Sequence, residues 1–91
     1  MKYLLFYEPG QDIATRGAEH MAAHGARIDE FHERGVLLGV GVLDEDPQSH
    51  GALALFTTRE AAEEFAKDDP FVLTGVVRSW RVVSWKDILD S

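Results

Sequence analysis

Residues 35–57 read GVLLGVGVLDEDPQSHGALALFT, and this stretch decides the fold. Residues 36–43 form an apolar run typical of a strand, and residues 52–57 form another. The polar segment between the runs, residues 44–51, contains proline and glycine and predicts a connecting loop. Two strands therefore follow each other in the middle of the chain with no helix predicted between them.

Helical patterns lie on both sides of these two strands. Residues 16–34 carry apolar side chains at helical spacing, and Gly35 is a typical C-terminal stop. After the second run, Thr58 is a good N-cap for a helix that ends near Asp68. The middle strand pair is thus predicted to lie between two helices along the chain.

A short helical turn and two outer strands complete the pattern. Pro70 and Gly75 mark the start and the end of one further helical turn. Residues 2–7 and residues 76–85 are β-rich and predict the first and last strands. The order β-α-β-β-α-β is that of ferredoxin-like folds, in which two helices pack on one face of a four-stranded antiparallel sheet. We expect an α+β fold of this kind, formed by one domain over residues 1–91.

The composition excludes several classes of partner. The chain has 91 residues, 45% of them apolar, and a formal net charge of −7 with its basic residues scattered. Nucleic acid and anionic membranes are therefore poor partners, because both require a concentrated positive surface. The chain has no cysteine, which fits a reducing compartment, and its first apolar run is too short for a signal peptide or a membrane span. We expect a cytoplasmic protein without a membrane segment.

The second and fourth predicted strands are apolar on both of their alternating faces. Two helices cover only one face of such a sheet, so the other face would expose a large apolar surface. We predict a homodimer in which the sheet faces of two copies pack together. Alternatively, these side chains are only strand ends and edge contacts. The residues concerned are Leu38, Val40 and Val42 against Leu37 and Leu43, and Trp80 and Val82 against Val77, Val83 and Trp85.

His24 is an unusual residue in the apolar stripe of the first helix, which also contains Met21, Ile28 and Phe31. A ring buried against the sheet needs a hydrogen-bond partner for at least one of its nitrogens. Our candidate partner is Asp69. Because this residue precedes a proline, we expect it to be extended and able to cap the short turn that follows.

Two interpretations of this pair remain open. In the catalytic one, the Asp69 carboxylate accepts a hydrogen bond from one nitrogen of His24 and fixes the tautomer, which leaves the other nitrogen free to take or give a proton. In the structural one, the carboxylate caps a turn and holds the helix against the sheet.

Three segments resemble the YCII-related (YciI-like) family. They are AHGARI at residues 23–28, ERGVLLGVG at residues 33–41, and residues 58–76, which contain EAA, FA, DPFV and GV in that order. The resemblance covers nearly the whole chain. It implies a dimeric α+β barrel with a histidine–aspartate active-site dyad, which falls on His24 and Asp69. Some members of the family look like catalysts that act on small aromatic or chlorinated compounds.

One position departs from the family pattern. Members often carry proline after the glycine of the second strand, whereas this chain has Val42 after Gly41. The rim of the pocket is expected to differ there.

Other motifs give no support for a metal or a cofactor. His20 and His24 are spaced i, i+4, but no third ligand accompanies them, so we expect an exposed His20 and no metal site. Gly39 and Gly41 lie inside a predicted strand and lack the third glycine of a phosphate loop, which favours close approach of a helix or a ligand. No G-x-S-x-G motif of a serine nucleophile is present. We predict a protein without a cofactor.

Two functions follow from these observations. The first is a cofactor-free enzyme with His24 as general acid/base and Asp69 as its orienting partner. It would act on a small cyclic or aromatic molecule as a lyase, an isomerase or a dehalogenase. A monooxygenase on a related dimeric α+β barrel is the nearest enzymatic alternative. The second function is a non-catalytic dimeric module that binds a small molecule or assists another protein.

Overall fold

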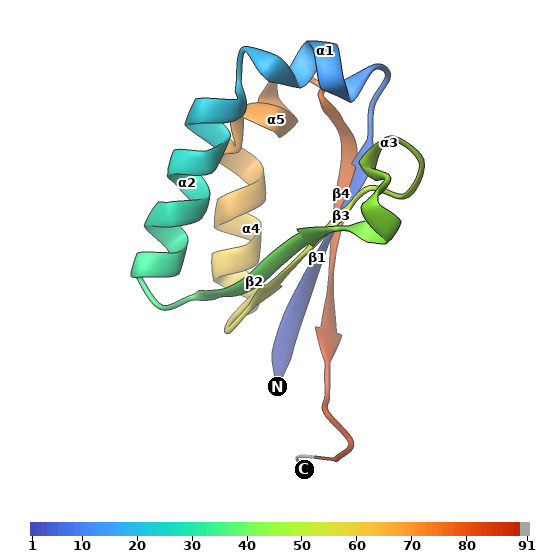
Figure 1. Ribbon diagram of the computed structural model, residues 1–91. Helices are drawn as coiled ribbons and strands as arrows, with labels where there is room; N and C mark the ends of the chain where they lie inside the picture. Colours follow the sequence, from blue (N-terminus) through green and yellow to red (C-terminus); the bar gives the residue numbers. More distant parts are fainter. Residues whose placement is uncertain (90–91) are drawn as a thin grey trace.

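The computed structural model describes residues 1–89 and contains a four-stranded antiparallel sheet with its long helices on one face (Figure 1). The strands lie in the order β2-β3-β1-β4, so β1 and β3 are central. This arrangement confirms the predicted α+β fold of the ferredoxin-like type. The strands are β1 (Lys2–Pro9), β2 (Leu37–Val42), β3 (Ala52–Phe56) and β4 (Val77–Trp85), and the long helices are α2 (Met21–Glu33) and α4 (Arg59–Asp68).

The region expected to form one helix over residues 16–34 contains two helices, so that prediction was wrong. The short helix α1 (Ile13–Ala18) ends before Glu19, and α2 starts at Met21 in a different direction (Figure 1). Gly17 of α1 is buried, and a Cβ atom there would lie 3.4 Å from the Phe71 side chain. The direction of α1 follows from its packing against the Phe71 side chain. Helical periodicity in the sequence does not predict such a tertiary contact.

The expected loop over residues 44–51 also contains short helices. These are the 3-10 turn η1 (Leu43–Glu45) and the helix α3 (Pro47–His50). The Asp46 side chain accepts a hydrogen bond from the Ser49 amide at 3.2 Å and caps α3. The loop is therefore ordered by its own capping residue and by the proline at the first position of α3.

The core lies between the sheet and the two long helices. Three phenylalanines meet at its centre, where the ring of Phe31 stands edge-on to those of Phe56 and Phe65, with centroids 6.4 and 5.2 Å away. Small residues on α4 bring that helix close to the sheet, because alanine side chains add little bulk. The buried core residues are Leu5, Tyr7, Phe31, Leu37, Ala54, Phe56, Ala61, Ala62, Phe65, Ala66 and Val77.

Two β-bulges change the predicted alternation of side chains. The register of β2 against β3 shifts between Leu37 and Gly39, and that of β1 against β4 shifts at Pro9. As a result, Leu37 lies on the helix-covered face together with Val40, which the alternation had placed opposite. Val77 likewise shares the covered face with Trp80.

The opposite face of the sheet is apolar, and no helix among residues 1–89 covers it (Figure 1). On the edge strand β2, this face carries Gly39 and Gly41. On the other strands it carries half-buried apolar side chains, with the Arg81 guanidinium 4.3 Å from the centroid of the Phe6 ring. These apolar residues, called the open face below, are Leu4, Phe6, Leu53, Leu55 and Val83.

Candidate active site

The two residues singled out in the sequence meet in the structure. His24 projects from α2, and Asp69 lies between α4 and the short helix α5 (Pro70–Leu73). Nδ1 of His24 is 2.8 Å from Oδ1 and 3.0 Å from Oδ2 of Asp69. The carboxylate is fully buried, and the imidazole keeps 14% of its side-chain surface exposed. A neutral ring that donates from Nδ1 has its lone pair on Nε2.

Backbone geometry explains the position of Asp69. The residue precedes Pro70 and is extended, with φ −68° and ψ 126°, so it ends α4 and begins α5. Its Oδ1 accepts a hydrogen bond from the Phe71 amide at 3.1 Å. The expected capping role is therefore present in the same carboxylate that pairs with His24, as its several lone pairs allow.

Tyr7 is a third member of this group, and the sequence reasoning missed it. Its hydroxyl donates to Oδ2 of Asp69 at 2.6 Å, and the bond is buried. Burial raises the pKa of this hydroxyl above its ordinary range, and the hydrogen bond and the charge of Asp69 act in the same direction. One signal was available: Tyr7 alternates with Leu5 on a core-facing strand, where a hydroxyl needs a partner.

Two aromatic rings pack against the His24 imidazole. The Phe71 ring stacks on the His24 ring with a centroid distance of 3.9 Å and an angle of 10° between the planes. Phe65 approaches it edge-on at 6.4 Å. With its face covered by Phe71 and Nδ1 bound to Asp69, the ring is held in one orientation.

A cavity of about 260 Å³ lies beside the ring, between α2, β2 and the short helices α1 and α3. His24 and Tyr7 are its titratable lining residues, and most of the remaining lining is apolar. Met21, predicted to face the core, is instead 56% exposed and lines this cavity. Other wall residues are Ile13, Val40, Val42, Phe71 and Val76.

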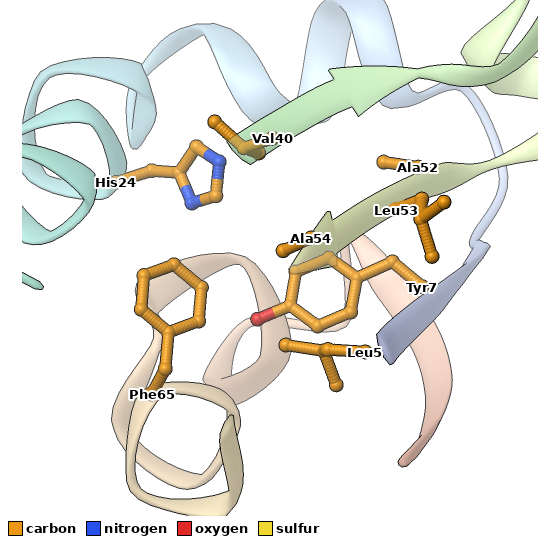
Figure 2. Close-up of a pocket in the computed structure, with 8 residues that line it drawn as sticks. All are labelled: Leu5, Tyr7, His24, Val40, Ala52, Leu53, Ala54 and Phe65. Atoms are coloured by element: carbon orange, nitrogen blue, oxygen red, sulfur yellow. The ribbon is translucent and has the colours of Figure 1, made fainter. Parts of the chain in front are cut away.

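A recess of about 30 Å³ lies deeper, between the imidazole and the sheet. Figure 2 shows the His24 ring projecting toward Val40 and the Tyr7 hydroxyl directed away from the sheet, toward Phe65. The recess is too small for more than a substituent of a ligand. The recess and the larger cavity share Tyr7, His24, Val40 and Ala52 as lining residues.

The remaining candidates do not join this site. Nε2 of His20 lies 3.2 Å from a carboxylate oxygen of Glu19. Among residues 1–89, no group of three or more histidine, cysteine or acidic side chains could hold a metal ion. A Cβ atom at Gly39 or Gly41 would meet nothing within 4 Å in this chain, so the close approach expected there is not found within it. No helix in the described part of the chain is long and apolar enough to cross a membrane.

Comparison with known proteins places the chain in a family. Protein YciI of Escherichia coli O6:H1 and that of Shigella flexneri are each 29% identical to it, across 97% of this chain and 99% of theirs. A solved structure of 5-chloro-2-hydroxyhydroquinone dehydrochlorinase (TftG) from Burkholderia phenoliruptrix AC1100, in complex with 2,5-dihydroxybenzoquinone, has the same fold. It superposes with a TM-score of 0.72 at 19% identity and covers 94% of both chains. The model of the YCII-related domain matches residues 1–86, and the chain belongs to this family.

Proposed function

We propose that the protein is a small-molecule enzyme in which His24 is the general acid/base and Asp69 orients it. The observation that carries this proposal is the contact of Nδ1 with a fully buried carboxylate, beside a cavity that His24 lines. A histidine held in this way presents one nitrogen to a ligand in a known tautomer. The likeness to TftG supports the fold on which such a site is built.

The proposed proton transfer uses only these side chains. Nε2 of His24 takes a proton from a C–H or O–H group of the bound molecule, and the imidazolium that forms is stabilised by the Asp69 carboxylate. The same nitrogen then returns the proton to another atom of the molecule or to a leaving group. Isomerisations follow this sequence. In an elimination of HCl from a ring, His24 removes the proton, chloride departs as an anion with the electron pair of the C–Cl bond, and the imidazolium then passes its proton to solvent.

We further propose an uncharged, ring-shaped ligand. The walls of the cavity are mainly aliphatic and aromatic, and no lysine or arginine of the described chain lines it. A carboxylate or phosphate bound there would add a second negative charge beside Asp69 in an apolar environment, which is unfavourable. The dihydroxybenzoquinone bound by TftG is also ring-shaped, and that ligand is a property of TftG.

The proposal includes a homodimer through the open face. Five half-buried apolar residues and two strand glycines would be left in contact with water in a single copy. Packing of two sheets face to face would remove this surface from water. The bare backbone at Gly39 and Gly41 would permit close approach of the partner.

Turnover by matched histidine variants tests the proposed reaction. The wild type is screened by absorbance against hydroxylated and chlorinated benzenes and quinones. We expect His24→Ala to lose roughly 10²- to 10⁴-fold of any activity found. His32→Ala is the control, because His32 lies on the same helix and binds the Leu37 carbonyl. Undiminished turnover in the folded His24→Ala protein would remove His24 from the mechanism.

One observation favours a second function, a non-catalytic binding module. The hydroxyl of Tyr7, the other titratable group that lines the cavity, is bound to Asp69 and leaves His24 without a second acid or base there. For such a module, His24→Ala would lower the free energy of unfolding by roughly 1–3 kcal/mol. Ligands would then bind the wild type without being converted.

A further inference from the structure

We infer that Tyr7 is a positioning residue, whose hydroxyl fixes the rotation of the Asp69 carboxylate so that it holds His24 by Nδ1. The inference rests on the proposed function for its catalytic meaning. Its geometric part concerns only the three side chains and can be tested without a substrate.

The two oxygens of Asp69 are held by different donors. Oδ1 accepts from the Phe71 amide at 3.1 Å and Oδ2 accepts from the Tyr7 hydroxyl at 2.6 Å. His24 Nδ1 lies between them, 2.8 Å from one oxygen and 3.0 Å from the other. The carboxylate is thus fixed at both ends, and its edge faces the imidazole.

Without the Tyr7 hydroxyl, Oδ2 of Asp69 would keep only its contact with the His24 imidazole. Asp69 has no exposed surface, so water cannot replace the missing donor unless the structure opens. Apart from the imidazole itself, the carboxylate would then be held by the Phe71 amide alone and could rotate about its Cβ–Cγ bond. The hold on Nδ1 would weaken.

The Tyr7 hydroxyl keeps its proton. Burial and the hydrogen bond and charge of Asp69 raise the pKa of the hydroxyl above its ordinary value, so Tyr7 keeps its proton and remains a donor at neutral pH. In this group of three side chains, the proton that moves is therefore the one on His24.

A second tyrosine on the same strand is available for comparison. Tyr3 lies on the same strand and the same face as Tyr7, four residues away, and its ring lies under the Arg59 guanidinium at 5.2 Å. Tyr3 contributes a comparable ring to the sheet at a place remote from Asp69. It therefore provides a matched control.

The experiment compares Tyr7→Phe with Tyr3→Phe. Long-range 15N–1H spectra of the imidazole report which nitrogen of His24 carries the proton in the neutral ring. We expect the Nδ1–H tautomer in the wild type and in Tyr3→Phe, and a mixture of both tautomers in Tyr7→Phe. The Asp69→Asn variant gives the reference spectrum of a His24 ring that has no carboxylate partner. An unchanged Nδ1–H tautomer in folded Tyr7→Phe would overturn the inference.

A measurement on the wild type covers the case in which Tyr7→Phe does not fold. The Tyr7 hydroxyl proton should exchange slowly and show a nuclear Overhauser effect to the Nδ1 proton of His24. A hydroxyl that exchanges as fast as that of a surface tyrosine would contradict the inference. Loss of turnover in His24→Ala tests the catalytic proposal separately, because the tautomer is read without a substrate.

Discussion

At the scale of single residues, Asp69 is the centre of the site. One buried carboxylate ends α4, caps α5, binds the imidazole and accepts from a tyrosine. Two of these roles could be predicted, because the effect of a following proline and the helical stripe of His24 are both local in sequence. The contact with Tyr7 could not, since it depends on β1 being a central strand opposite the helices.

Replacing Asp69 by asparagine should reduce stability. The amide leaves at least one of the three donors around it without an acceptor, at a cost of roughly 1–3 kcal/mol. Asp68→Asn removes the same charge from the neighbouring, exposed position and should leave stability within about 0.5 kcal/mol of the wild type. Urea unfolding of the two variants measures the difference. Equal stabilities would mean that the carboxylate contributes nothing to the fold.

Alkaline pH should weaken the protein through Tyr7. The pKa of the hydroxyl is raised in the folded state, whereas in the unfolded chain it has the ordinary value of about 10. The stabilisation is therefore complete below pH 10. Above it, stability falls because the unfolded chain releases a proton that the folded protein keeps.

Tyr7→Phe cannot release that proton and provides the reference. The difference in unfolding free energy between wild type and variant should shrink by up to about 1.4 kcal/mol per pH unit above pH 10. Denaturant unfolding between pH 8 and 11 follows it. A difference that stays constant over this range would contradict the raised pKa.

At the scale of elements, the strands and the long helices could be predicted, but their junctions could not. The order of helices and strands follows from local periodicity. The bulges at Leu37 and Pro9 and the break between α1 and α2 depend on tertiary packing, which a periodic pattern does not contain. This is why the faces of β2 and β4 were assigned incorrectly.

Two glycines separate the effect of tertiary packing from that of local helix propensity. Gly51 has a φ of 82°, and a Cβ atom there would collide with the Tyr7 carbonyl, so Gly51→Ala should cost at least about 1–3 kcal/mol. Gly25 in α2 has free space around it, and Gly25→Ala should stabilise the helix by up to about 1 kcal/mol. Thermal unfolding of both variants measures these opposite shifts. A stabilising Gly51→Ala would show that the strand can move away.

At the scale of the whole molecule, the open face determines the proposed assembly. Leu55→Glu places a charge at its centre and should convert the dimer into a monomer of 10.2 kDa. Leu73→Glu makes the same change on α5, where the side chain is 67% exposed, and should leave the dimer intact. Light scattering at micromolar concentration measures the mass. A wild type of 10.2 kDa would contradict the dimer.

The lining of the cavity has an evolutionary consequence. Ile13, Met21, Val42 and Pro47 border the cavity but are not among the buried core residues, whereas Asp69 and Tyr7 are buried in the interior. Mutations at these four lining residues can therefore accumulate with little loss of stability, whereas mutations at the buried Asp69 and Tyr7 reduce it. A lineage built on this scaffold can diverge in the lining of its cavity and still inherit the same group of His24, Asp69 and Tyr7.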